Sequence, residues 1–237
     1  KIFAVTRIGG LFRGASMAEL QERLLQVVEA LDLREKFIFV EECRGLTLGL
    51  LIKLRARLEG VLLMNFHLYA PDDYMDSPFL AKMQEVFKNF AEIWRARPRN
   101  PAELAKHLSS VVFMKDADSA EGITEKMRAF LDQESQDYFD MMTWVFDRQG
   151  GEWLSFMADL RRDAQPFTRL PTVLACGAFA PEGVVVQSTV RLQCLFPQST
   201  IRYIPNSKLL CQAEGREQLD GVVRLVEELL GKVDAAT

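Results

Sequence analysis

Residues 37–51 read FIFVEECRGLTLGLL, a short apolar run, rich in aromatic and β-branched residues, that passes into leucines at helical spacing. This pattern is typical of a buried β-strand that turns abruptly into an α-helix. Cys43 stands at the turn between the two elements. The stretch therefore predicts a strand–turn–helix unit and makes the Cys43 thiol the first candidate for chemistry.

The segments around this unit alternate between short strands and amphipathic helices. IFAV (2–5), KFIFV (36–40) and GVLLMNF (60–66) have the composition of buried strands. The helix after the first strand begins at an S-x-x-E capping box, and its apolar face consists of Met17, Leu20, Leu24, Val28 and Leu31. The helix after Cys43 spans 44–58 and is closed by Gly60. Strands that alternate with helices predict a parallel sheet covered on both faces.

The middle of the chain has helical patterns alone. We expect residues 71–165 to form a helical lid inserted into a core made of residues 1–70 and 166–237. In the second part of the core, LPTVLACG (170–177) and STIRYIP (199–205) are strands that flank a helix near 184–196. A last helix starts near 214 and stops at Gly231, and its buried face is predicted to be Leu219, Val222, Val223, Val226, Leu229 and Leu230.

Composition limits the classes of function. The chain has 237 residues, is 49% hydrophobic and carries a net charge of −4, which suits one sizeable domain. Residues 71–165 hold 18 acidic and 12 basic side chains, so nucleic-acid binding is disfavoured. No apolar run reaches the roughly 20 residues that span a bilayer. Four cysteines without C-x-x-C spacing and only two histidines predict reduced thiols, no metal site and no cofactor. They also favour an intracellular location, which we expect to be the cytoplasm, with an organelle as the open alternative.

The order of elements resembles the α/β-hydrolase fold, from its fourth strand to its C-terminus. In that family the nucleophile lies in a G-x-S-x-G turn, and residues 41–45 here read EECRG, with Cys43 in the serine column. LPTVLACGAFA aligns with the strand that carries the catalytic acid and places Ala180 in the acid column. IPNSKLLCQAEGREQL aligns with the segment of the catalytic histidine and places Leu209 there. The resemblance thus implies a hydrolase scaffold that has lost its acid and its base.

Among families of this fold, the pattern is most similar to the N-myc downstream-regulated proteins, which keep the scaffold without a working triad. The resemblance rests on SMAELQERLLQVVEAL, LEGVLLMN and GAFAPEGVVVQS. It implies a pseudoenzyme. In the hydrolase fold the third strand lies between the fourth and the fifth. We therefore expect that the first three strands are absent from this sequence, or that another segment occupies the third strand's place.

Three functions stay open. The first is a non-catalytic protein that binds protein partners, within a larger complex or alone, through the acidic lid. The second is a Cys-dependent hydrolase or thioesterase in which Cys43 is assisted by a relocated base, with His67 as the candidate because it follows the strand 60–66. The alternative for His67 is that it starts the lid, its ring bonded to a backbone group or to Asp72 or Asp73. The third is a receptor that holds a small molecule in the vestigial pocket.

Overall fold

The computed structural model describes residues 16–32, 36–42, 48–66, 165–180, 185–208 and 215–236, together with the single residue Glu92. Nearly all of the predicted lid, 71–165, lies outside these residues, and so does the predicted strand at 2–5. The division into core and lid therefore stays a prediction.

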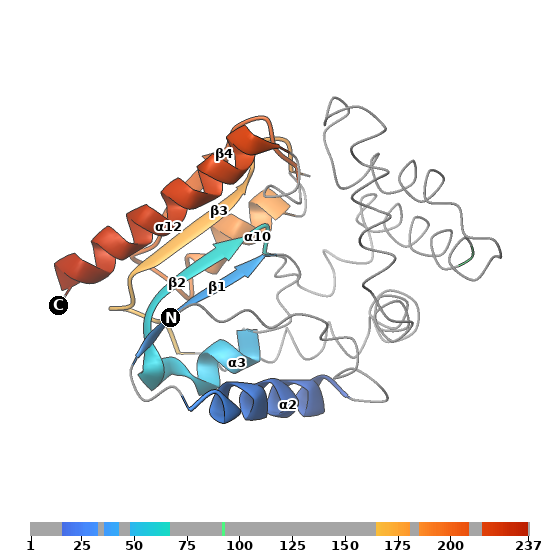
Figure 1. Cartoon of the computed structure of the whole chain (residues 1–237), viewed down its shortest axis with the longest axis vertical. Coiled ribbons are helices and arrows are strands. Elements are labelled where there is room, and N and C mark those ends of the chain that lie inside the picture. Colours follow the sequence, from blue (N-terminus) through green and yellow to red (C-terminus); the bar gives the residue numbers. More distant parts are fainter. Residues whose placement is uncertain are drawn as a thin grey trace.

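Within the described residues, four parallel strands form a sheet, in the order in which they occur along the chain (Figure 1). They are β1 (Phe37–Glu42), β2 (Leu58–Met64), β3 (Thr172–Gly177) and β4 (Thr200–Ile204). Glu42 lies opposite Met64, Met64 opposite Ala175, and Gly177 opposite Ile204. Both β2 and β3 are almost wholly buried, as the apolar composition of parallel strands predicts. The predicted parallel α/β sheet is confirmed.

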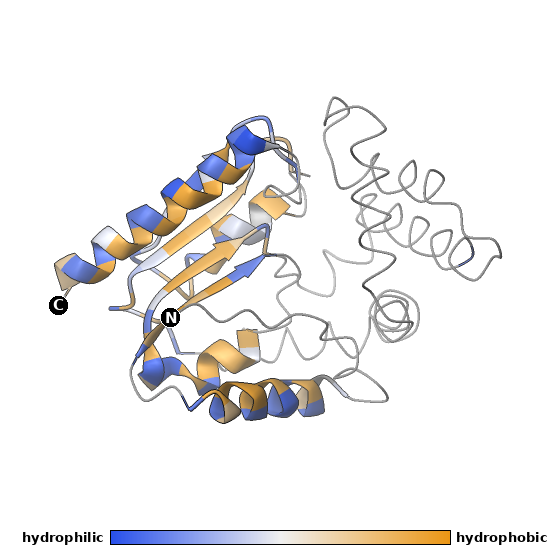
Figure 2. Cartoon of the chain, in the orientation of Figure 1, coloured by the Kyte–Doolittle hydropathy of each residue, from blue (hydrophilic) through white to orange (hydrophobic). Residues whose placement is uncertain are grey.

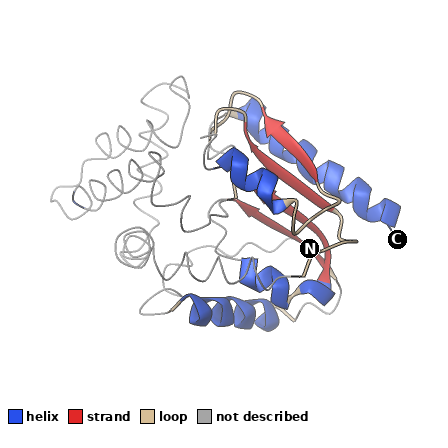
Figure 3. Ribbon diagram, turned by 180° about the vertical axis from the view of Figure 1, so that it is seen from behind, coloured by secondary structure: helices blue, strands red, loops and turns tan. Residues whose placement is uncertain are grey.

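Helices cover both faces of the sheet (Figures 1 and 3). α12 (Arg216–Ala236) packs on one face, where its Leu225, Leu229 and Val233 join Leu62 and Val173 in a buried cluster. α10 (Gln187–Leu192) lies on the other face, against β3. α2 (Met17–Ala30) and α3 (Leu48–Lys53) pack on each other. The 3₁₀ turn η1 (Arg55–Arg57) follows α3 in the chain. The capping box predicted at the start of α2 is confirmed.

The last helix differs from its prediction in two ways. It continues through Gly231 to Ala236, because Val233 beyond the glycine is buried against Gly60 of β2. Tertiary packing therefore overrides the weak helix propensity of glycine. The face on the sheet is Gln218, Gly221, Leu225, Leu229 and Val233, whereas Leu219, Val223 and Leu230 are exposed. Of the predicted buried residues, only Leu229 is fully buried.

One arginine fixes the segment that leads into β3. The Arg55 guanidinium lies 4.1 Å from the centre of the Phe167 ring and donates to the carbonyl oxygens of Gln165 and Pro166. Phe167 stacks on Phe196, with ring centres 4.9 Å apart. These contacts join the start of β3 to η1 and to the chain that follows α10.

Candidate functional site

The carboxyl ends of the four strands lie at one edge of the sheet, because all four strands run in the same direction. In open α/β sheets this edge is where ligands bind. Cys43 is the next residue along the chain after β1, Ala180 comes three residues after β3, and Leu209 comes five residues after β4. The three columns of the predicted triad therefore belong to segments that leave the same edge.

Of the predicted site residues, only Ala180 lies within the described part of the chain. Its backbone N–H donates to the Gly177 carbonyl oxygen at 2.9 Å, closing a turn after β3, and its side chain is 7% exposed. A methyl group cannot orient an imidazole. Cys43, Leu209 and His67 lie outside the described residues, so the roles given to them stay predictions.

Asn65 is a structural element of this edge that the sequence interpretation missed. It follows β2 directly, is fully buried and has φ of +48°, the left-handed region that asparagine tolerates better than other side chains. Its Oδ1 accepts a hydrogen bond from the Gly177 N–H at 3.0 Å, and its own N–H donates to the Ala175 carbonyl oxygen at 2.8 Å. Asn65 therefore ties the end of β2 to the end of β3. The sequence signal was an asparagine directly after an apolar strand.

The segment after β4 packs on the backbone of the turn after β3. The Phe179 N–H donates to the Ser207 carbonyl oxygen at 2.9 Å, and the Ala178 N–H donates to the Ile204 carbonyl oxygen at 2.9 Å. A Cβ on Gly177 would lie 2.2 Å from the Lys208 carbonyl oxygen, so only glycine fits there. Two segments that carry triad columns in the resemblance are thus held in contact by backbone groups.

A side chain of α2 fixes the start of the helix that follows Cys43. Gln21 is buried, and its Oε1 accepts a hydrogen bond from the Leu50 N–H at 2.8 Å. Leu50 is in the first turn of α3, where backbone N–H groups have no partner within their own helix. Glu41 and Glu42, directly before Cys43, are half-buried, and one carboxylate oxygen of Glu42 is fully buried. The edge next to Cys43 therefore contains carboxylates.

The cysteines that the structure describes are not catalytic candidates. Cys176 lies on β3 and is fully buried, and burial raises the pKa of its thiol to about 11, although a hydrogen bond with the Thr189 side chain partly offsets this. At neutral pH the thiol is protonated and inert. Cys194 is exposed beyond the end of α10.

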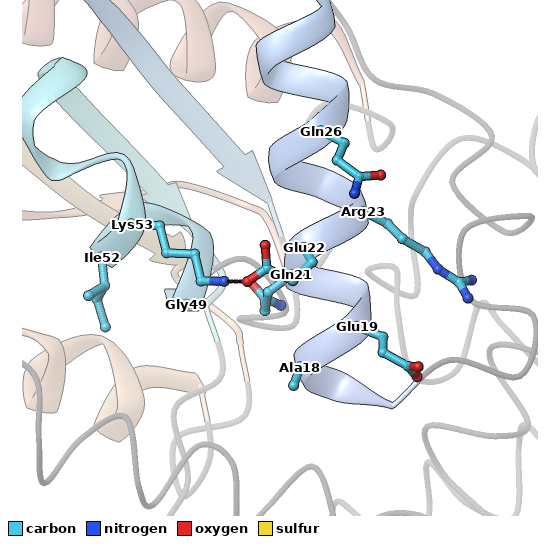
Figure 4. A pocket seen from close by; sticks show the side chains of 9 residues that line it. All are labelled: Ala18, Glu19, Gln21, Glu22, Arg23, Gln26, Gly49, Ile52 and Lys53. Atoms are coloured by element: carbon cyan, nitrogen blue, oxygen red, sulfur yellow. Dashed lines mark hydrogen bonds and ion pairs between the residues drawn. The ribbon is translucent and has the colours of Figure 1, made fainter.

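A groove of about 590 Å³ lies between α2 and α3 (Figure 4). The Lys53 ammonium pairs with the Glu22 carboxylate across it, while Glu19, Arg23 and Gln26 extend from α2. Its charges are of both signs and belong to surface side chains, so this groove offers no convergent set of catalytic groups. Among the described residues, no three His, Cys, Asp or Glu side chains gather as metal ligands, and no helix is long and apolar enough to cross a membrane.

Comparisons with known proteins identify the fold. No family model and no curated protein matches the sequence. A thermophilic esterase from Thermogutta terrifontis has a similar structure, with a TM-score of 0.62 and 19% identity over 92% of this chain and 73% of the esterase. A meta-cleavage product hydrolase from Pseudomonas fluorescens matches with a TM-score of 0.63 and 16% identity, over 92% of this chain and 72% of that hydrolase. An α/β-hydrolase from a deep-sea metagenome matches with a TM-score of 0.59 and 15% identity, over 91% of this chain and 72% of that hydrolase.

The chain therefore has the α/β-hydrolase fold, as the order of its elements predicted. The prediction that it is not an enzyme is contradicted, because these structural neighbours are esterases and hydrolases. That prediction relied on three aligned columns, of which only Ala180 lies in the described residues, and loss of an acid or base column does not remove the thiol of Cys43. Likeness at this level of identity shows the fold alone. The closer resemblance to the N-myc downstream-regulated proteins stays a prediction.

Proposed function

We propose that this protein hydrolyses esters or thioesters, with Cys43 as the nucleophile. The observation that carries the proposal is the position of Cys43 in the chain, directly after β1, at the sheet edge where parallel α/β enzymes bind their substrates. A thiolate is a strong nucleophile even without a complete triad. The fold shared with esterases and hydrolases supports this class of reaction.

The base in this proposal is His67. β1 and β2 are neighbours, with Glu42 opposite Met64, so Cys43 and His67 follow adjacent strand ends, one and three residues beyond this pair. The thiol gives its proton to the imidazole, and the sulfur attacks the substrate carbonyl carbon. The leaving alcohol or thiol takes that proton as its bond to carbon breaks. Water then attacks the acyl-cysteine, the imidazole accepts the water proton and returns it to sulfur, and the carboxylic acid is released.

Hydrolysis of short-chain p-nitrophenyl esters and acyl thioesters tests the proposal. We expect turnover by the full chain that falls to the background rate in Cys43→Ala and by roughly 10²- to 10⁴-fold in His67→Gln. The matched control is Cys194→Ala, which removes an exposed thiol away from this edge and should leave the rate unchanged. A wild-type rate no higher than that of a folded Cys43→Ala protein would contradict the proposal.

Two other predicted functions concern residues outside the described part of the chain. Protein binding through residues 71–165 and small-molecule binding in a pocket beneath them both stay predictions, and neither requires the absence of turnover. Saturation of hydrolysis by an ester, with competition by a non-hydrolysable analogue, would indicate that the pocket takes ligands of this class.

A further inference from the structure

The turn that follows β3 carries a large aromatic side chain that the fold does not use. The Ala180 N–H donates to the Gly177 carbonyl oxygen, so Ala178 and Phe179 are the two central residues of the turn. Turns favour Gly, Asn, Asp, Ser or Pro at such positions. The Phe179 side chain is 56% exposed, more than any other large apolar side chain of the described residues, whereas Ala180 is buried. Neither turn formation nor core packing therefore accounts for the aromatic ring.

The backbone that carries this ring is fixed. The Phe179 N–H donates to the Ser207 carbonyl oxygen, and the Ala178 N–H donates to the Ile204 carbonyl oxygen, both at 2.9 Å. Before the turn, Gly177 leaves no room for a Cβ between itself and the backbone of the segment after β4. A side chain on a backbone that is already ordered costs less entropy to immobilise when it binds a ligand. Phe179 therefore has an exposed ring on a preorganised support.

This turn leaves the sheet at the same edge as Cys43. The register places Glu42, Met64 and Ala175 in one row across β1, β2 and β3. Cys43 follows this row by one residue and Phe179 by four, and in Figure 1 the arrowheads of the three strands point to the same side. The ends of β1 and β3 are about 10 Å apart, because neighbouring strands are about 4.8 Å apart. An acyl group of moderate length bridges that span.

The edge changes from polar to apolar along the same direction. β1 ends in Glu41 and Glu42, and Figure 2 shows its end as hydrophilic and the end of β2 as hydrophobic. The turn after β3 consists of Ala178, Phe179 and Ala180, and Lys208 borders it through a backbone carbonyl oxygen. Ligand sites combine a few polar groups that orient the ligand with an apolar lining. The polar carbonyl of an ester suits the β1 side of this edge, and an apolar acyl tail suits the β3 side.

We propose that Phe179 is a specificity-determining residue that binds the acyl group of the substrate, and that the preferred acyl group carries an aromatic ring at its far end, as 3-phenylpropanoyl does. The inference rests on the proposed hydrolysis at Cys43 and narrows its substrate class. Aromatic rings attract one another in offset-stacked or edge-to-face arrangements, beyond the gain from burying their apolar surface. An acetyl group on the Cys43 sulfur ends too soon to reach the end of β3, so it gains nothing from Phe179.

The acyl preference of the full chain tests this role. The preference is the ratio of kcat/KM for p-nitrophenyl 3-phenylpropanoate to kcat/KM for p-nitrophenyl acetate. Phe179→Ala should lower this ratio at least about ten-fold, since an apolar group in a pocket changes kcat/KM by that order. Phe179→Tyr keeps the ring and should keep most of the preference. An unchanged ratio in Phe179→Ala would overturn the inference.

Tyr203→Ala is the matched control. Tyr203 is an aromatic residue of β4 that is 53% exposed, and its side chain stands on a face of the sheet, because strand side chains are roughly perpendicular to their sheet. Its removal should leave the acyl preference unchanged. Both replaced side chains are exposed, so the variants should fold, which circular dichroism checks. An equal loss of preference in Tyr203→Ala and Phe179→Ala would overturn the assignment to Phe179.

A binding measurement separates this inference from the proposed hydrolysis. The probe is 4-phenyl-2-butanone, a ketone with the same acyl group and no bond to hydrolyse, and its match is 2-butanone, which lacks the ring. Ligand-observed NMR should find that wild type binds the phenyl ketone and that Phe179→Ala binds it at least about ten-fold more weakly. Such binding in a wild type that hydrolyses no ester would reject the hydrolysis and support the site at Phe179. No preference for the phenyl ketone over 2-butanone, or equal binding by wild type and Phe179→Ala, would overturn the site.

Discussion

At the scale of single residues, Gly177 shows how little freedom the sheet edge has. A Cβ at this position would lie 2.2 and 2.5 Å from the backbone carbonyl oxygens of Lys208 and Ser207, neither of which belongs to a flexible side chain. We expect Gly177→Ala to lower the free energy of unfolding by about 3 kcal/mol, the upper end of the usual cost of overpacking, because the turns after β3 and β4 must separate. Urea denaturation measures the change.

Gly231 offers the matched control for that substitution. It lies inside α12, and no atom of the described residues is within 4 Å of the place that an added methyl group would take. Gly231→Ala should therefore stabilise the protein by up to about 1 kcal/mol, the difference in helix propensity. Equal stability of the two alanine variants would contradict the inference that a Cβ at position 177 clashes with the backbone.

The two described thiols should differ in reactivity. Because burial raises the pKa of Cys176 to about 11, its thiol stays protonated, and therefore unreactive, at every pH up to about 10. Cys194 is exposed and accessible to reagents. Iodoacetamide at pH 8, followed by peptide mass spectrometry, should find Cys194 alkylated and Cys176 unmodified while the protein is folded. Alkylation of both at similar rates would contradict the buried position of Cys176.

At the scale of elements, the start of α2 depends on a reciprocal pair. The Ser16 N–H donates to the Glu19 carboxylate at 2.7 Å, and the Glu19 N–H donates to the Ser16 Oγ at 3.2 Å. The hydrogen bond from the Ser16 backbone N–H, and after it one from the Ser16 side chain, lower the pKa of the Glu19 carboxyl below its usual 4.5. A lowered folded-state pKa gives stability that is present above the unfolded pKa and lost as the pH falls through the folded one.

Ser16→Ala should therefore cost about 0.5–2 kcal/mol of stability at pH 7. Alanine keeps the backbone N–H that donates to Glu19, so below pH 4.5 the gap between variant and wild type should narrow only by what the Ser16 hydroxyl contributes to the Glu19 carboxylate. Thermal unfolding at pH 7, 5 and 3 gives the comparison. A gap that stays constant down to pH 3 would mean that the Ser16 hydroxyl does not stabilise the Glu19 carboxylate.

The buried link between α2 and α3 makes a separate prediction. Gln21→Ala leaves the Leu50 N–H buried without its acceptor, which should cost about 1–3 kcal/mol. Gln26→Ala, at an exposed position of the same helix, should change stability very little. Because α3 follows Cys43 in the chain, Gln21→Ala should also lower the proposed hydrolysis rate. An unchanged stability in Gln21→Ala would contradict the link.

The elements also show how far the sequence predicts this structure. Apolar strands and the capping box are local patterns, so strands 36–40 and 199–205 were placed within two residues of β1 and β4. The buried face of α12 was not predicted correctly. Leu219 and Leu225 are the same residue type, and only the position of the sheet decides which of them is buried. The contact between Asn65 and Gly177 joins residues 112 positions apart, and no local pattern reports it.

At the scale of the whole molecule, the sheet is assembled from two distant parts of the chain. β2 ends at Met64 and its partner β3 begins at Thr172, so the pairing of these two strands must overcome the loop entropy of more than a hundred residues. Asn65 lies at this junction, with its side chain bonded to Gly177 and its N–H bonded to Ala175. Its contribution to stability is therefore a contribution to the joining of both halves.

Two substitutions of Asn65 separate its side chain from its backbone conformation. Asn65→Gly keeps the φ of +48° accessible but leaves the Gly177 N–H without an acceptor, at a cost of about 1–3 kcal/mol. Asn65→Ala loses the same hydrogen bond and adds the strain of a left-handed alanine, roughly 1 kcal/mol more. Urea denaturation should therefore rank wild type above Asn65→Gly and Asn65→Ala last, with a single transition because the two halves share one sheet. Two separate transitions in either variant would mean that the halves fold independently and that Asn65 does not couple them.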